Sequence, residues 1–172
     1  MVDKKDSSTD SASAARGDRA IDPAIGQSID KGAGTQRRRA RILCMRALYQ
    51  WEITSDPLDE QAASLLENTR VREDVRNYAV HLISLVHTSQ TDIDELLTDC
   101  LTDRWPLHRL ASIDRCVLRM GTAELLFSLH VPTNVILNEC IEIAKKYGSQ
   151  EDTGRFVNGV LDQIAQRARG KL

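Results

Sequence analysis

An apolar repeat with helical spacing runs through the chain from Arg37 onward, and this repeat limits the fold more than any other feature. Over residues 37–53 it comprises Ala40, Leu43, Cys44, Ala47, Leu48 and Trp51. Steps of three and four residues place these side chains on one face of a helix. No segment shows the alternation of apolar and polar residues that a half-buried strand requires. The sequence therefore predicts an all-α protein.

Prolines and glycines divide the repeat into about seven helices. We expect these helices at residues 37–53, 58–66, 71–87, 93–101, 107–129, 132–147 and 149–165. The segment 107–129 is apolar over much of its circumference, which predicts that this helix is central. Gly148 is the expected C-cap of the sixth helix, and Ser149 to Asp152 has the spacing of a capping box that starts the seventh.

Residues 1–36 differ in composition from the rest of the chain. They are rich in Ser, Asp, Gly and Ala and contain almost no large apolar residues. Such a segment buries too little apolar surface to offset the entropy of ordering, so we expect a disordered N-terminal tail. Residues 37–172 then form one helical domain. Aromatic residues make up only 4% of the chain, so aliphatic side chains are expected to fill its core.

The sequence also indicates a cytoplasmic protein. No apolar run approaches the ~20 residues that a membrane-spanning helix needs, and the first residues lack the apolar core of a secretory signal. The four cysteines are Cys44, Cys100, Cys116 and Cys140. They lie within apolar helical patterns and lack the close pairing of a zinc site. We interpret them as reduced thiols in the core, which suits a reducing compartment.

Motifs that carry catalysis are absent from the sequence. The chain has no phosphate-binding loop of the G-x-x-x-x-G-K-[ST] type, no dinucleotide-binding glycine motif and no nucleophile elbow. Its histidines have no acidic partner at ligand spacing, and its acidic pairs lie at helix starts or on solvated faces. The sequence therefore predicts a protein that is not an enzyme and that uses no metal or cofactor.

Five arginines occupy ten positions at the start of the first expected helix. They are Arg37, Arg38, Arg39, Arg41 and Arg46. The whole chain has a formal net charge of -2, so this basicity is local. A cluster held on a helix predicts a phosphate-binding surface, although a charge run is more simply a solvated face. Tyr49 and Trp51 beside the cluster favour single-stranded RNA, whose bases stack on aromatic side chains.

A second candidate surface is the turn that joins the last two expected helices. Tyr147 offers an aromatic ring, and Gly148 and Ser149 precede the free backbone N–H groups of the last helix. Anions are favoured at this end of a helix. The turn therefore adds to the support for a nucleic-acid ligand.

Several segments of the helical domain together resemble the NusB transcription antitermination factors. They are Arg37 to Arg41, Ala47 to Trp51, Val117 to Met120, Val131 to Glu139, Ala144 to Gly148 and Phe156 to Asp162. These segments occur in the order and with the spacing of the family, and the resemblance covers essentially the whole helical domain. It implies the NusB fold, in which two small helical bundles pack together. The tail is longer than the few residues that usually precede the arginines in this family.

The resemblance also implies a function. The family binds the boxA element of nascent RNA together with the small-subunit ribosomal protein NusE, and it supports processive transcription of ribosomal RNA operons by RNA polymerase. The RNA-binding residues implied for this chain are Arg37, Arg38, Arg39, Arg41, Tyr49, Tyr147, Gly148, Asp152 and Arg155. The acidic residue implied for the NusE-binding surface is Asp114, which without the resemblance is better interpreted as a solvated helix residue. The residues interpreted as structural, in caps and contacts between helices, are Asn138, Glu139, Phe156 and Asn158.

Three alternatives stay open on the sequence alone. In the first, the chain is a protein-interaction module whose arginines contact an acidic protein. In the second, it is a detached relative of the NusB-like domain of ribosomal RNA cytosine methyltransferases, although a chain ending at Leu172 has no room for a methyl-donor-binding sheet. In the third, a homodimer hides the arginine cluster.

Overall fold

The computed structural model describes residues 33–54, 56–67 and 70–170. Within these residues it contains seven α-helices, one short 3₁₀ helix and no strand, which confirms the all-α prediction. The elements are α1 (Ala33–Thr54), α2 (Leu58–Glu67), α3 (Glu73–Thr88), α4 (Gln90–Cys100), η2 (Leu107–Arg109), α5 (Ser112–Phe127), α6 (Thr133–Tyr147) and α7 (Thr153–Arg169).

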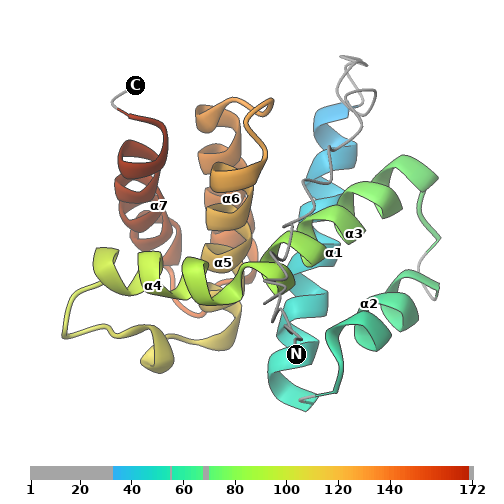
Figure 1. Ribbon diagram of the computed structural model, residues 1–172, viewed down its shortest axis with the longest axis horizontal. Coiled ribbons are helices and arrows are strands. Elements are labelled where there is room, and N and C mark those ends of the chain that lie inside the picture. The colour runs from blue at the N-terminus through green and yellow to red at the C-terminus, as the bar shows by residue number, and fades with distance from the viewer. Residues whose placement is uncertain (1–32, 55, 68–69, 171–172) are drawn as a thin grey trace, which may run out of the picture.

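The helices form two packed groups that meet at α5 (Figure 1). Helices α1, α2 and α3 contact one another, and α4, α6 and α7 each contact α5. Helix α5 also contacts α1 and α3, so it joins the two groups. Every residue of α5 from Cys116 to Leu125 is buried. The expected central helix and the two-bundle arrangement are therefore both confirmed.

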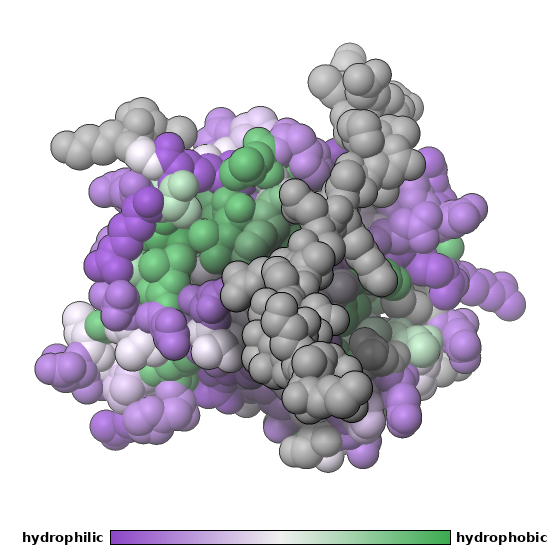
Figure 2. All heavy atoms as spheres, viewed as in Figure 1, coloured by the Kyte–Doolittle hydropathy of each residue, from purple (hydrophilic) through white to green (hydrophobic). Residues whose placement is uncertain are grey.

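The core is filled mainly by aliphatic side chains and sulfur. All four cysteines are buried and free of disulfides, which confirms their interpretation as core thiols. Burial raises the pKa of the Cys116 and Cys140 thiols to about 12. Polar residues cover much of the surface, but Figure 2 shows an apolar area bordered by polar side chains over the α4–α7 half of one face.

Helix α1 begins at Ala33 rather than at the expected Arg37. Residues 33–36 are therefore part of the first helix and not of the tail. The rest of the expected tail, residues 1–32, lies outside the described residues.

The single helix expected at residues 107–129 is interrupted, so that boundary prediction is wrong. The backbone of Leu110, with φ -66° and ψ 147°, is extended between η2 and α5. The guanidinium of Arg115 donates to the carbonyl oxygens of Leu107 at 3.2 Å and Leu110 at 3.0 Å, and also to the carboxylate of Glu52 in α1. These bonds give the Leu110 carbonyl a donor and add a second donor to the Leu107 carbonyl, which also accepts from the N–H of Leu110. They fix the connection against α1.

Helix α7 begins at Thr153, so the capping box expected from Ser149 is also wrong. Gly148 does follow α6 as its C-cap, but its φ of -64° is not left-handed. A Cβ atom at this position would lie 2.4 Å from the carbonyl oxygen of Ala144 and 2.6 Å from Cγ2 of Thr153. Glycine is required here because the chain passes too close to α6 and α7 for any side chain.

Candidate nucleic-acid interface

Helix α1 presents a basic stripe to solvent. The stripe consists of Arg39, Ile42, Arg46, Tyr49 and Ile53, and we call these residues the α1 stripe. Their steps of three and four residues place them on one side of the helix. All except the half-buried Ile42 are exposed, and neither arginine forms an ion pair within the described residues. The stripe therefore offers two unpaired guanidinium groups and one aromatic ring to a ligand.

Arg41 lies on the core side of α1 and is only 1% exposed, so the prediction that it contacts RNA is wrong. Its Nε and Nη2 atoms donate to the two carboxylate oxygens of Glu124 in α5, at 2.7 and 2.5 Å. Glu124 is fully buried and also accepts a hydrogen bond from the hydroxyl of Tyr78 in α3. Burial alone would lower the pKa of Arg41, but the hydrogen bonds and charge of Glu124 raise it above its ordinary value. Arg41 thus joins three helices from inside.

Arg37 is half-buried and directed toward α3. Its guanidinium carbon lies 5.4 Å from the centre of the Tyr78 ring, within the range of a cation–π contact. The Tyr78 hydroxyl is itself held by Glu124, and its pKa is raised by burial and by that carboxylate. Arg37 is therefore oriented by the buried network, with part of its side chain still reaching solvent.

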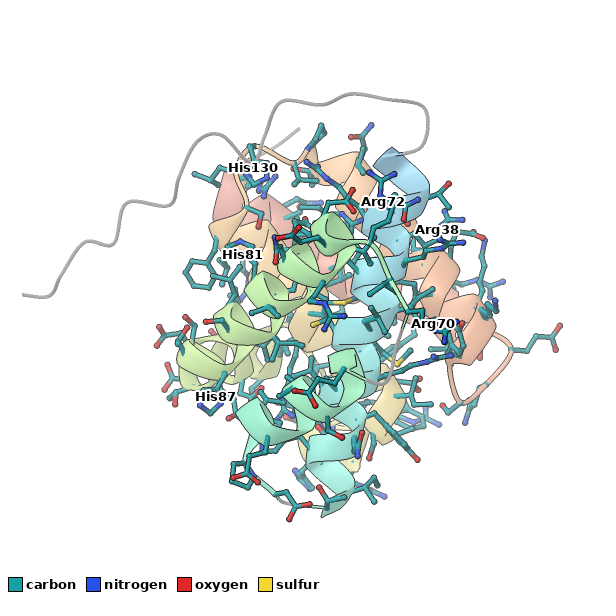
Figure 3. All side chains as sticks on the ribbon, turned by 90° about the vertical axis from the view of Figure 1, so that its right-hand side faces the viewer. Arg38, Arg70, Arg72, His81, His87 and His130 are labelled. Atoms are coloured by element: carbon teal, nitrogen blue, oxygen red, sulfur yellow. The ribbon has the colours of Figure 1, made fainter. Side chains whose placement is uncertain are left out.

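Arg38 lies beside the α1 stripe and faces α6. Its Nε and Nη2 atoms donate to the two carboxylate oxygens of Glu139, at 2.7 and 2.8 Å. The Arg38 side chain is 47% exposed and that of Glu139 is 15% exposed. This pair confirms that Glu139 makes a contact between helices. Figure 3 shows Arg38 and Arg70 on the side of the molecule away from His81 and His130.

The α6–α7 connection holds the remaining residues that the resemblance implies for RNA binding. Tyr147 is half-buried against the core, and the Nζ atom of Lys146 lies 5.3 Å from the centre of its ring. Asp152 and Arg155 are exposed at the start of α7, and Asp152 makes no side-chain capping bond. The connection and its flanks therefore expose the cations Lys146 and Arg155 and the carboxylates Glu151 and Asp152 beside a partly covered aromatic ring.

Asp114 is buried, with 7% of its surface exposed, and it does not form the expected partner surface. Its carboxylate accepts hydrogen bonds from the backbone N–H of Ser149 at 3.1 Å and from the Ser149 hydroxyl at 2.6 Å. The alternative interpretation, a solvated helix residue, is wrong for the same reason. Asp114 instead anchors the α6–α7 connection to the first turn of α5.

One side of α6 runs from Glu139, the partner of Arg38, toward the α6–α7 connection. Glu139, Glu142 and Lys146 share that side because they are spaced by three and four residues. Since Glu139 contacts Arg38, Lys146 lies about 10 Å further along the helix at 1.5 Å per residue. We call the following residues the basic face: Arg38, Arg39, Arg46, Tyr49 and Lys146. The resemblance did not imply Arg46 or Lys146, although the seven-residue step from Arg39 to Arg46 is a signal of a shared helix side.

Two other arginines lie in an open groove but are already paired. The groove measures about 560 Å³ and is lined by residues of α1, α4, η2 and α5 and by Pro106. Arg115 and Arg119 donate to Glu52 at 2.6 and 2.5 Å, and Arg119 also donates to Asp94 at 2.8 Å. A phosphate in this groove would have to displace these carboxylates, so the groove is a poorer anion site than the basic face.

Neither a metal site nor a membrane-spanning helix is found in the part of the chain that the structure describes. No group of three or more His, Cys, Asp and Glu residues there has an arrangement suited to a metal ion. In the same part, no helix has both the length and the apolar character needed to cross a bilayer.

Comparison with known proteins identifies one family. The model of the NusB family matches residues 38–166. The transcription antitermination protein NusB of Pseudomonas savastanoi is 41% identical over 143 residues, which cover 81% of this chain and 82% of that protein. The transcription antitermination protein NusB of Thermotoga maritima is 41% identical over 136 residues, covering 77% of this chain and 92% of that protein.

Solved structures of NusB proteins have the same fold. The structure of T. maritima NusB aligns with a TM-score of 0.69 and 38% identity, over 76% of this chain and 90% of that one. A crystal structure of the antitermination factors NusB and NusE in complex with double-stranded RNA contains a chain that aligns with a TM-score of 0.71. That chain is 28% identical, and the alignment covers 77% of this chain and 98% of that one.

Proposed function

Because this chain belongs to the NusB family, we propose that it is a transcription antitermination factor that binds boxA-containing single-stranded RNA on its basic face. The α1 stripe carries this proposal, since Arg39 and Arg46 are exposed and have no ion pair within the described residues. A solved complex of NusB and NusE, which contains a chain of the same fold, holds double-stranded RNA. The RNA and NusE are the corresponding partners proposed here.

The chemistry of the basic face suits a single strand. Arg39, Arg46 and Lys146 contact phosphates, which fixes the position of the strand but carries no sequence information. Tyr49, with 40% of its surface exposed, stacks on a base, and Tyr147 offers a second ring further along. Arg37 and Arg38 contribute from the edge of the face, and Arg155 contributes from the start of α7.

Asp114 supports this surface indirectly. It holds the backbone of Ser149 next to Tyr147 and Gly148, so the shape of the α6–α7 connection depends on it. Asp114 therefore acts by positioning that connection, and not as an exposed contact for the ribosomal protein.

In the cell, the protein connects RNA and NusE to elongating RNA polymerase and supports processive transcription of ribosomal RNA operons. This role depends on binding alone. We therefore propose that the protein is not an enzyme and that it acts in the cytoplasm, where its RNA is transcribed.

A titration tests the proposed function. The protein is titrated with a boxA-containing RNA and with a scrambled RNA of equal length, with and without NusE, at 50 and 200 mM salt. We expect tighter binding of the boxA RNA, an increase in its affinity with NusE, and weaker binding at the higher salt concentration. Equal affinity for the two RNAs in the presence of NusE would reject the proposal. Binding of an acidic peptide that boxA RNA does not displace would also reject it.

A further inference from the structure

Glu139 lies between two arginines of α1 that differ in their surroundings. Its two carboxylate oxygens accept hydrogen bonds from Nε and Nη2 of Arg38, at 2.7 and 2.8 Å. The Nη1 atom of Arg41 is 4.0 Å from Oε2 of the same carboxylate. Arg38 is 47% exposed, whereas Arg41 is buried and bound to Glu124. Glu139 therefore has one partner that solvent can reach and one that it cannot.

The pair between Arg38 and Glu139 occupies one of the two N–H edges through which this guanidinium could bind a phosphate, the edge formed by Nε and Nη2. A guanidinium binds a carboxylate or a phosphate through two parallel N–H groups. Nε and Nη2 of Arg38 are both directed at Glu139. An RNA phosphate can bind Arg38 through this edge only after the carboxylate has left, so binding at this edge is an exchange of partners.

Arg41 makes that exchange feasible. A largely buried carboxylate without a partner is strongly unfavourable. When Arg38 turns away, Glu139 still lies next to the charge of Arg41, which cannot leave because Glu124 and the core hold it in place. The carboxylate therefore gives up one partner but is not left in isolation.

We propose that Glu139 is a built-in competitor of RNA, which occupies Arg38 in the free protein and moves toward Arg41 when an RNA phosphate binds Arg38. The inference rests on the proposed function, because it concerns the same RNA surface. The competitor lowers the affinity for every RNA that uses Arg38. An RNA that also stacks on Tyr49 has a further contact, which Glu139 does not oppose.

The test compares Glu139→Gln with Glu142→Gln. Both variants remove one negative charge from the same side of α6, but Glu142 forms its ion pair with Lys145 and acts on Arg38 only through its charge. We expect Glu139→Gln to bind boxA RNA roughly two- to fivefold tighter than the wild type, because a partly exposed ion pair no longer competes. This gain should vanish in an Arg38→Ala background. Any gain from Glu142→Gln should be smaller and should depend less on Arg38.

The outcomes separate the two proposals. If the wild type does not prefer boxA RNA, the proposed function fails and this inference falls with it. If the wild type does prefer boxA RNA but the gains of the two variants are equal or do not depend on Arg38, only this inference is overturned. Thermal unfolding confirms that each variant is folded.

The Nε–H resonance of Arg38 in the wild-type protein gives a second measurement. We expect this resonance to shift on addition of RNA, and an unchanged resonance would contradict the exchange.

Discussion

The five arginines at the start of α1 have three different environments. Arg39 and Arg46 are exposed and unpaired within the described residues, Arg37 and Arg38 are held by groups on α3 and α6, and Arg41 is buried. The sequence predicted the cluster but not this division, because each partner lies far along the chain. One signal did exist, since an acidic residue at position 124 within an apolar segment needs a buried cation.

Replacement of Arg41 tests whether its role is structural. Arg41→Met leaves the buried Glu124 carboxylate without its cation, so we expect the free energy of unfolding to fall by about 3–5 kcal/mol. The measurement is urea unfolding followed by circular dichroism. Arg39→Met, at an exposed position of the same helix, should change stability by no more than about 0.5 kcal/mol. Equal effects of the two substitutions would show that Arg41 is not in a buried ion pair.

The buried thiols give the protein a stability that depends on pH. Burial raises the pKa of Cys116 and Cys140 from 9.0 to about 12. The folded protein therefore keeps protons that the unfolded chain releases above pH 9. The contribution is fully present below pH 9 and is lost as the pH rises toward 12, at no more than about 1.4 kcal/mol per pH unit for each thiol.

Urea unfolding at pH 8, 9 and 10 measures this contribution. The free energy of unfolding of the wild type should fall more steeply above pH 9 than that of Cys116→Ala. The comparison uses slopes, so a constant loss of stability from the smaller side chain does not affect it. Parallel curves for the two proteins would contradict the raised pKa of Cys116.

Helix boundaries depend on side chains that bind backbone groups from other helices. The apolar spacing continues unbroken through residues 107–129, yet the helix is interrupted at Leu110. Arg115 donates to the carbonyl groups of Leu107 and Leu110 at this interruption and also binds Glu52. Asp114 similarly accepts hydrogen bonds from Ser149, and these hold Ser149 in the connection before α7. Periodicity could predict which segments are helical, because it reflects burial within each helix. It could not predict where these helices stop, because that is decided by contacts between distant segments.

Asp114→Ala tests the anchoring of the α6–α7 connection. The substitution removes the acceptor of two hydrogen bonds from Ser149, and we expect a loss of about 1–3 kcal/mol in stability. Amide hydrogen exchange at residues 148–152 should become faster, since this segment is no longer attached to α5. Asp92→Ala is a matched control, because Asp92 is an exposed acidic residue in the first turn of α4. Unchanged exchange at residues 148–152 would rule out the anchoring role.

In the molecule as a whole, the buried residues that hold the helices together differ from the exposed residues proposed to contact RNA. The two helical groups meet at α5, whose buried Glu124 ties α1 and α3 to the second group. The basic face then lies on elements that are fixed from behind. The sequence and its family resemblance predicted the helical architecture and the arginine cluster on the first helix. They could not separate Arg41 from Arg46, because both fall within the cluster and only the packing of α1 against α5 decides which one is exposed.

The most direct test is the salt dependence of RNA affinity for two double variants. Arg39→Ala/Arg46→Ala removes two exposed charges from the α1 stripe, and Arg104→Ala/Arg109→Ala removes two exposed charges between α4 and α5. For the first, we predict weaker binding of boxA RNA and a slope of log affinity against log salt that is smaller by about 1.4, or about 0.7 for each phosphate that an arginine no longer neutralises. The second should bind as the wild type does. If the two double variants instead bind equally well, or the second binds more weakly than the first, the RNA does not lie on the α1 stripe.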